Sequence, residues 1–278
     1  MMKEKQFSAF RIEPSHGRVS LDLPELWIYR ELIYFLIWRD IKVRYRQTVM
    51  GISWAIIQPF LFMVVFSFFF GRLIGVPTEG IPYPIFSYSA LVPWTFFSNT
   101  INQASNSLVN NANMIKKIYF PRLVMPIASV FAGLLDFLLA FLVLIGMMIF
   151  YSVPISLRIL ALPCFVLMTI ACSMGVSFWL SSLNVQFRDV RYIIPFLTQL
   201  WLFATPIAYS SNLLEDRWRI LYGLNPMAGV VEGFRWVLLG TSSNSSILIL
   251  TSALMTLLLL ISGSLYFRKM EGHFPDII

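Results

Sequence analysis

Long apolar runs, separated by short polar stretches, dominate the chain from residue 49 onward. A helix needs about 20 residues to cross the roughly 30 Å hydrocarbon core of a bilayer. Six runs are long enough, and we expect each to form a spanning helix. They are Val49–Phe70, Pro84–Leu108, Leu123–Phe150, Ile159–Leu183, Tyr192–Tyr209 and Ile247–Phe267. The pattern therefore predicts an all-α polytopic membrane protein with six transmembrane helices.

Two further segments are apolar but do not fit a complete span. Residues 210–246 join the last two spans and contain Pro226–Leu239, which is too short to cross and is interrupted by Glu232 and Arg235. A re-entrant outer hairpin between the fifth and sixth spans suits this length best.

The second such segment, Pro24–Gln47, precedes the first span. Arg39, Lys42 and Arg46 recur at helical spacing on one face, while apolar residues share another. This pattern is typical of an amphipathic helix in the membrane interface, serving either as an anchor or as a docking element for a cytosolic partner.

Composition and charge agree with this reading. Hydrophobic residues make up 58% of the 278 and charged residues only 13%, which excludes an ordinary soluble domain. Sixteen Lys and Arg residues lie outside the spans on the side of the two termini and five on the other, so both termini are expected in the cytoplasm. This bias explains the net charge of +7 without nucleic acid. We expect a cytoplasmic amino-terminal segment over 1–48, a transmembrane domain over 49–267 and a cytoplasmic tail over 268–278.

Motifs for chemistry are scarce in the sequence. It contains no Gly-x-x-x-x-Gly-Lys-[Ser/Thr] loop, which excludes ATP hydrolysis by a P-loop within this chain. Neither His-Glu-x-x-His nor Gly-x-Ser-x-Gly occurs, and no Cys/His cluster has metal-ligand spacing. We therefore expect a chain that is not an enzyme and holds no metal or cofactor of its own.

Asp136 is the acidic residue deep in a predicted span. An ionised carboxylate at that depth costs at least about 2.5–3.5 kcal/mol, so it needs a partner or water. It could serve ion coupling in a secondary transporter, or it could be a hydrogen-bonded residue that packs helices together.

Five asparagines follow one another at helical spacing from the second predicted span toward the cytoplasm, and they are Asn99, Asn102, Asn106, Asn110 and Asn113. The spacing of three or four residues places all five amides on one helical face. Either this stripe lines a wet passage, where neutral amides suit sugar hydroxyls, or it packs against another helix through hydrogen bonds.

Aromatic residues also crowd the spans, and some of them must form ordinary interfacial belts. Others lie deep enough to offer faces along which a sugar chain could slide, although contact with lipid is the default for any one of them. With the stripe they define a candidate translocation path. Its members are Trp54, Phe60, Tyr88, Asn99, Asn102, Asn106, Phe196, Trp201 and Phe203.

The segment from Gly51 to Pro59 is preceded by a basic segment from Trp38 to Tyr45. This arrangement resembles the start of the membrane domain in the ABC-2 type permeases that export polysaccharides. The remaining similarities are Lys116 to Pro121 in the first cytoplasmic loop, Phe187 to Asp189 in the second, Leu224 to Pro226 with Arg235 in the outer hairpin, and Glu271 with Phe274 and Asp276 in the tail. Gly272 and His273 depart from the family pattern within the tail.

The resemblance implies a homodimer bound to two copies of a separate nucleotide-binding subunit, which would hold ATP and Mg. Such an assembly exports a lipid-linked O-antigen, capsule or teichoic-acid type polymer from the bacterial cytoplasm across the inner membrane. The residues that we expect to contact the ATPase partner are Arg39, Lys42, Arg46, Lys116, Lys117, Arg188 and Asp189. Each could also be a solvated positive-inside residue.

Two other functions remain open from the sequence: an ion-coupled secondary transporter and a membrane-embedded enzyme of glycolipid metabolism. The scarcity of clustered ionisable groups in the spans weakens both of them.

Overall fold

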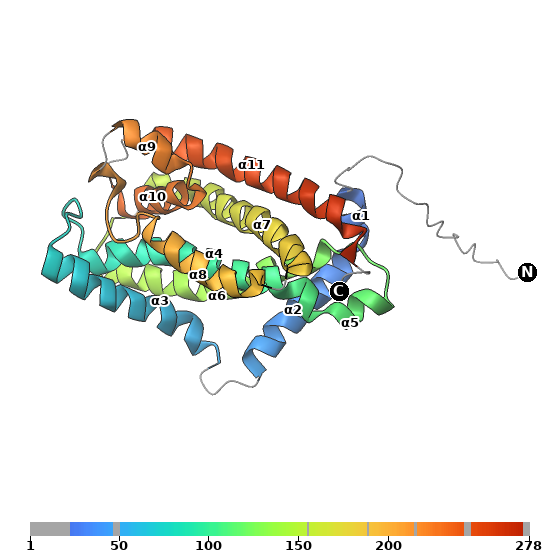
Figure 1. Cartoon of the computed structure of the whole chain (residues 1–278). Helices are drawn as coiled ribbons and strands as arrows, with labels where there is room; N and C mark the ends of the chain where they lie inside the picture. Colours follow the sequence, from blue (N-terminus) through green and yellow to red (C-terminus); the bar gives the residue numbers. More distant parts are fainter. Residues whose placement is uncertain are drawn as a thin grey trace, which may run out of the picture.

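The computed structural model describes residues 23–46, 51–154, 156–187, 189–213, 216–241 and 246–274, and these residues form helices and turns without a strand (Figure 1). The α-helices are α1 (Leu23–Ile28), α2 (Arg30–Arg46), α3 (Ser53–Phe66), α4 (Tyr83–Asn110), α5 (Ala112–Lys117), α6 (Val124–Phe150), α7 (Leu162–Gln186), α8 (Val190–Phe203), α9 (Asp216–Gly223), α10 (Pro226–Leu239) and α11 (Ser246–Glu271). A π-helical turn, η1 (Ser67–Ile74), extends α3, and short 3₁₀ turns lie at η2 (Leu157–Ala161) and η3 (Ser211–Leu213). The all-α prediction is confirmed for this part of the chain.

Four helical stretches within the described residues are long and apolar enough to cross a membrane. They are Ser53–Ile74, Val124–Phe150, Leu157–Gln186 and Ser246–Glu271. The chain is therefore a multi-pass membrane protein. These stretches contain the fourth and sixth predicted spans and most of the first and third, which begin at Ser53 rather than Val49 and at Val124 rather than Leu123.

The fifth predicted span is shorter than the sequence suggested. Its helix, α8, ends at Phe203 rather than continuing to Tyr209. Fourteen helical residues measure about 21 Å, which is less than the hydrocarbon thickness. Pro206 lacks the backbone N–H that would continue the helix, and Arg235 donates to carbonyls of the turn that follows instead.

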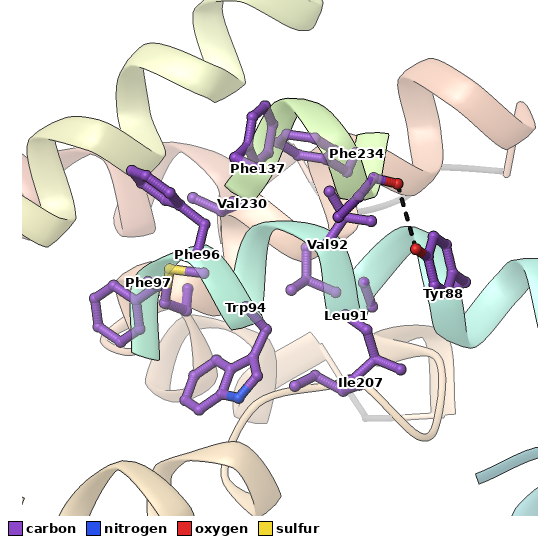
Figure 2. Close-up of a cluster of buried hydrophobic side chains, with 14 of the residues drawn as sticks. Tyr88, Leu91, Val92, Trp94, Phe96, Phe97, Phe137, Ile207, Val230 and Phe234 are labelled. Atoms are coloured by element: carbon purple, nitrogen blue, oxygen red, sulfur yellow. Dashed lines mark hydrogen bonds between the residues drawn. The ribbon is translucent and has the colours of Figure 1, made fainter. Parts of the chain in front are cut away.

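The second predicted span, α4, is long enough but is the least typical as a lipid-facing helix. Twenty of its 28 residues are buried. Figure 2 shows Val92 and Phe96 of α4 on the side of Phe137 of α6 and Phe234 of α10, whereas Leu91 points toward Ile207. The rings of Phe96 and Phe137 meet edge to face with centroids 5.6 Å apart. Its neighbours supply the apolar contacts, so α4 forms the centre of the bundle.

Helices α7 and α11 pack with their backbones close together. A Cβ atom at Gly175 would lie 2.7 Å from the backbone carbonyl carbon of Leu259, and the facing Gly263 is equally crowded. Nearby, the rings of Trp179 and Tyr266 stack at 4.2 Å. Small residues permit this close approach. In lipid the hydrophobic effect does not drive helices together, so the dispersion contacts that close packing adds are important for their association.

One end of the bundle, which we call the basic end, gathers α2, α5 and the last turn of α11. Leu36 of α2 is fully buried there with Leu108, Phe267 and Phe274. Helix α2 packs against α6, and Leu36 shares its cluster with Val124 and Ala128. A helix therefore forms in the predicted amino-terminal segment and packs on the bundle through Leu36, while Tyr34, Phe35 and Val43 on its other sides are exposed.

At the opposite end, α9 and α10 fold back against α11 in the region where we expected the re-entrant hairpin (Figure 1). The bounds of α10 match the predicted segment Pro226–Leu239, and 12 of its 14 residues are buried. Asn225 caps the helix by accepting the Met227 N–H at 3.1 Å, and Pro226 occupies its first turn.

The packing of α7 on α11 generates a test of stability. Replacing Gly175 by Ala should lower the thermal stability of the detergent-solubilised protein, because the added methyl group must push two backbones apart at a cost of about 1–3 kcal/mol. The matched control is Gly146→Ala in α6, where nothing lies within 4 Å of the added Cβ. Equal melting temperatures for the two variants would contradict the close packing.

Candidate translocation path and coupling surface

The asparagine stripe lies along one side of α4. The Asn102 side-chain N–H donates to the Ser98 carbonyl at 2.8 Å, and that of Asn106 donates to the Asn102 carbonyl at 2.7 Å. Asn106 also accepts a hydrogen bond from Asn184 of α7 at 3.1 Å. The side chains of Asn102 and Asn106 are half-buried. With Asn99, which donates to Gln58 of α3, the stripe makes two contacts to other helices and two bonds within α4.

Two cavities open along this stripe. The first, which we call the front cavity, lies nearer the basic end, between α2 and α4, and has a volume of about 510 Å³. It is strongly polar, with three arginines and several amides in its wall. The lining residues are Arg39, Asp40, Val43, Arg44, Asn102, Gln103, Asn106, Ser107, Asn110, Asn111, Ser129 and Arg191.

The second, the back cavity, lies deeper along α4 and has a volume of about 550 Å³. Its lining residues are Arg44, Tyr45, Gly51, Trp54, Ala55, Gln58, Asn99, Gln103 and Asp136. From Asn110 to Asn99 the two cavities follow α4 for 11 residues, or about 17 Å. Asn99 donates to Gln58 of α3 at 3.3 Å across the back cavity.

Asp136 has partners on α2, which the sequence pattern did not identify. Arg44 forms an ion pair with it, and the Tyr45 hydroxyl donates to its other oxygen. The second guanidinium nitrogen of Arg44 donates to Gln103 of α4. Arg44 lies about 140° around the helix from Arg39 and therefore off the cationic face. The sequence did show that Asp136 needs a partner, and this need was the signal that could have indicated the pairing with Arg44.

The predicted aromatic path residues fall into different surroundings. Trp54 lines the back cavity, whereas Phe60, Phe196 and Phe203 are exposed on the outer surface of the chain. Tyr88 is fully buried in the core, and its hydroxyl donates to the Ala140 carbonyl at 3.3 Å.

Trp201 is half-buried and lines neither cavity. Its ring meets Phe97 edge to face at 5.1 Å, and its indole N–H donates to Asn225 at 2.9 Å. Asn225 in turn donates to the Ala204 carbonyl at 3.0 Å. This network joins the end of α8 to the start of α10.

Most of the predicted ATPase contacts lie at the surface. Lys42 and Arg46 of α2, Lys116 and Lys117 of α5, and Asp189 before α8 are exposed. Arg39 is half-buried beside Asp40, to which it donates at 2.8 Å, and it lines the front cavity. The structure thus brings Arg39 together with Asn102 and Asn106. Arg188 and Asp276 lie outside the described residues.

The tail residues of the family motif hold the basic end together. The backbone N–H of Arg122 donates to the Glu271 carboxylate at 2.6 Å, and Arg268 pairs with the same carboxylate at 3.1 Å. The ring of Phe274 packs on that of Phe267 at 5.3 Å. These contacts join the loop before α6 to the end of α11.

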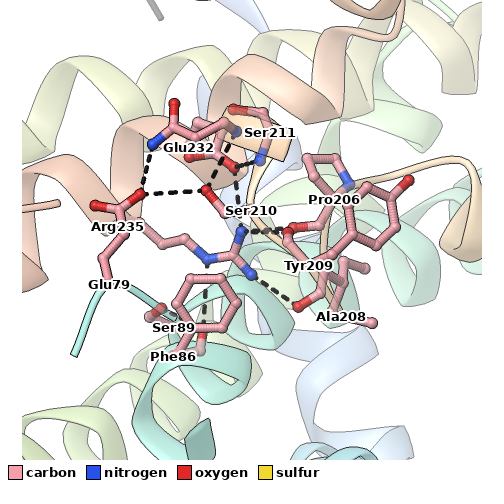
Figure 3. Close-up of polar contacts among 12 residues, drawn as sticks. Glu79, Phe86, Ser89, Pro206, Ala208, Tyr209, Ser210, Ser211, Glu232 and Arg235 are labelled. Atoms are coloured by element: carbon pink, nitrogen blue, oxygen red, sulfur yellow. Dashed lines mark hydrogen bonds and ion pairs between the residues drawn. The ribbon is translucent and has the colours of Figure 1, made fainter. Parts of the chain in front are cut away.

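At the opposite end, a fully buried arginine organises the chain between α8 and α9 (Figure 3). Arg235 of α10 donates to the carbonyls of Pro206 at 2.6 Å, Ile207 at 2.7 Å and Tyr209 at 3.1 Å. Its guanidinium lies 3.7 Å from the ring centre of Phe86 in α4. The side chain therefore joins α4, α10 and the turn after α8.

Glu232 supplies the opposite charge for this arginine. Its carboxylate accepts from Arg235 at 3.2 Å and from the backbone N–H of Ser211 at 3.0 Å. The two residues that interrupt the apolar pattern of α10 are thus one buried ion pair with its hydrogen bonds satisfied.

Comparison with known proteins places this architecture in a family. The model of the ABC-2 type transporter family matches residues 31–239, which is most of the chain. The chain belongs to the ABC-2 type transporter family. The matched region of this ABC-2 chain runs from α2 to α10 and includes both cavities and the Arg235 network.

Similar individual proteins cover nearly the whole ABC-2 chain. It is 26% identical to the O-antigen export system permease protein RfbA of Myxococcus xanthus, over 91% of this chain and 98% of that protein. It is 29% identical to the protein of the same name from Klebsiella pneumoniae, over 89% and 95% of the two chains. The polysialic acid transport protein KpsM of Escherichia coli is 23% identical over 84% and 91%.

The Arg235 network leads to a test in this ABC-2 chain. Arg235→Met should sharply lower the yield of monodisperse protein in size-exclusion chromatography. The variant leaves Glu232 buried without its partner, and such a loss costs about 3–5 kcal/mol. The matched control, Arg158→Met, removes an exposed guanidinium that lies 5.5 Å from the Trp236 ring and should retain the yield. Equal losses would refute the organising role of Arg235.

Proposed function

We propose that this chain is the transmembrane permease subunit of an ATP-driven ABC exporter that moves a lipid-linked polysaccharide, such as O-antigen, out across the bacterial cytoplasmic membrane. The observation that carries the proposal is the likeness to O-antigen export permeases over nearly the full length of both chains. The amides that line both cavities along α4 support it, because they can exchange hydrogen bonds with sugar hydroxyls.

The proposed topology has six membrane crossings with both termini in the cytoplasm. In this arrangement α4 crosses inside the bundle, shielded by its neighbours, while the short α8 and the turn that follows it cross together. The pair α9 and α10 forms the outer re-entrant hairpin. The basic end then faces the cytoplasm, in agreement with the positive-inside rule.

The proposed assembly is a homodimer with two nucleotide-binding subunits that hold ATP and Mg. The sequence has no P-loop, so ATP hydrolysis requires a separate subunit. The exposed Lys42, Lys116 and Lys117 at the basic end offer a surface for its binding. Movement of these elements on ATP binding would shift the equilibrium between closed and open passages. Phe60, Phe196 and Phe203, which are exposed on one chain, are then available to the second copy, the passage or lipid.

An ion-coupled carrier is the weaker alternative for this fold. Asp136 would be its natural coupling group, but its carboxylate already has Arg44 and Tyr45 as partners. A pair of this kind favours an internal structural contact over an open ion site.

The assembly is tested by purification from cells that also express the neighbouring ATPase component of such a system. We expect the permease to co-purify with a P-loop protein and to export glycolipid in proteoliposomes only when ATP is supplied. Lys116→Glu with Lys117→Glu should weaken the association, whereas Lys269→Glu in the last turn of α11 should not. Export driven by an ion gradient through the permease alone would overturn the proposal.

The path is tested by comparing two asparagines with different surroundings. Asn102 lines the front cavity and bonds within its own helix, whereas Asn184 is buried and bonds across to α4. Asn102→Leu should lower export several-fold with little change in folded yield. Asn184→Leu should lower folded yield, because burying the unpaired partner costs about 1–3 kcal/mol. Parallel losses of export and yield in Asn102→Leu would indicate a packing role instead.

A further inference from the structure

The front and back cavities are separated by two side chains. Arg44 of α2 and Gln103 of α4 are the residues that line both cavities. They are also joined to each other, since the Arg44 guanidinium donates to the Gln103 side-chain carbonyl. This hydrogen bond, exposed at Gln103, therefore lies where the two cavities meet along the asparagine stripe.

Arg44 is held at the boundary by α6. One of its terminal nitrogens pairs with Asp136, and the neighbouring Tyr45 donates to the second oxygen of the same carboxylate. Arg44 and Asp136 keep only 21% and 17% of their side-chain surface exposed. The pair is thus largely shielded from water, where an ion pair is stronger than at an open surface.

The pair connects elements that belong to different parts of the chain. Asp136 is fixed within α6, one of the apolar spans, whereas Arg44 belongs to α2, the helix that carries Arg39 and Lys42. Arg39 and Arg44 are five residues apart, or about 7.5 Å along the helix. A displacement of α2 at its exposed cationic face would therefore also move Arg44.

We propose that Arg44 closes the passage between the two cavities by its contact with Gln103, and that Asp136 and Tyr45 are positioning residues that hold it closed. The inference rests on the proposed function, because it takes the stripe to be the route of the exported glycan. When α2 moves with its ATPase partner, Arg44 leaves Gln103 and the cavities join into one polar channel along α4.

The experiment measures access to the back cavity with a charged, membrane-impermeant thiol reagent applied to inside-out vesicles. Cys164 and Cys172 are first replaced by Ser and Ala, respectively. A cysteine is then placed either at Ala55 in the back cavity or at Asn110 in the front cavity. In the nucleotide-free complex we expect rapid labelling at position 110 and labelling at least several-fold slower at position 55.

Opening the boundary should abolish this difference. Arg44→Ala should accelerate labelling at position 55 several-fold and leave position 110 unchanged. The double variant Arg44→Ala with Asp136→Asn should do the same, and it removes both charges together so that no unpaired carboxylate destabilises the protein. The matched control is Arg30→Ala, which removes an exposed arginine at the other end of α2 and should leave both rates unchanged.

A second measurement separates a gate from a merely structural contact. In the ATPase complex, Arg44→Ala should retain nucleotide-dependent ATP hydrolysis while lowering export per ATP, whereas Arg44→Lys should restore part of the export. Rapid labelling at position 55 in the unaltered complex, or labelling that Arg44→Ala does not change in folded protein, would overturn the proposal.

The proposed function can fail separately. If Arg44→Ala opens the back cavity but no nucleotide changes labelling in any complex, the boundary stands and ATP-driven opening is refuted. If nucleotide accelerates labelling at position 55 equally with and without Arg44, the exporter assignment stands and the gate is wrong.

Discussion

A polar group embedded among apolar helices must find its partner within the protein, because lipid hydrocarbon offers none. This constraint explains the main features of the structure. Asp136 in a spanning helix is reached by Arg44 and Tyr45 from α2. Arg235 in the buried α10 is surrounded by backbone carbonyls and by Glu232. In both cases the requirement for a partner joins segments that are distant in the sequence.

The two ionic contacts act on different parts of the bundle. Arg235 is fully buried and donates to carbonyls of a turn that lacks helical partners, so it stabilises an irregular segment beside apolar helices. Arg44 is partly exposed, joins two helices that carry their own backbone hydrogen bonds and lies between two cavities. The Arg235 contact therefore suits a fixed part of the structure. The Arg44 contact can be replaced by hydrogen bonds to water without unfolding a segment.

The amides of the stripe are neutral hydrogen-bonding groups on a helix that its neighbours largely cover. Asn102 bonds within α4, so it draws no neighbouring helix across the front cavity, whereas Asn99 reaches Gln58 of α3 across the back cavity. The surrounding helices meanwhile bury most of the rest of α4. A polar face can therefore remain next to a cavity inside a chain whose outer surface is apolar, which is the arrangement that a hydrophilic polymer requires for passage through a membrane.

Much of this organisation could be predicted from the sequence. Hydrophobic runs indicated the apolar helices, and the bounds of Val124–Phe150 and Pro226–Leu239 agree with the prediction within a residue. Asparagine spacing indicated one polar face, and the isolation of Asp136 indicated that it needs a partner. These inferences succeed because they depend on local periodicity and on the cost of burying a charge, both of which are properties of a segment by itself.

Tertiary structure decided which faces meet. Arg44 is 92 residues away from Asp136 and lies off the cationic face of its helix, so no local pattern could pair them. The early end of α8 and the central burial of α4 likewise depend on neighbours, because a turn is stable only where Arg235 satisfies its carbonyls and a polar helix only where others cover it. Periodicity identifies the residues that share a face, whereas the partner of that face is selected by the packing of the whole chain.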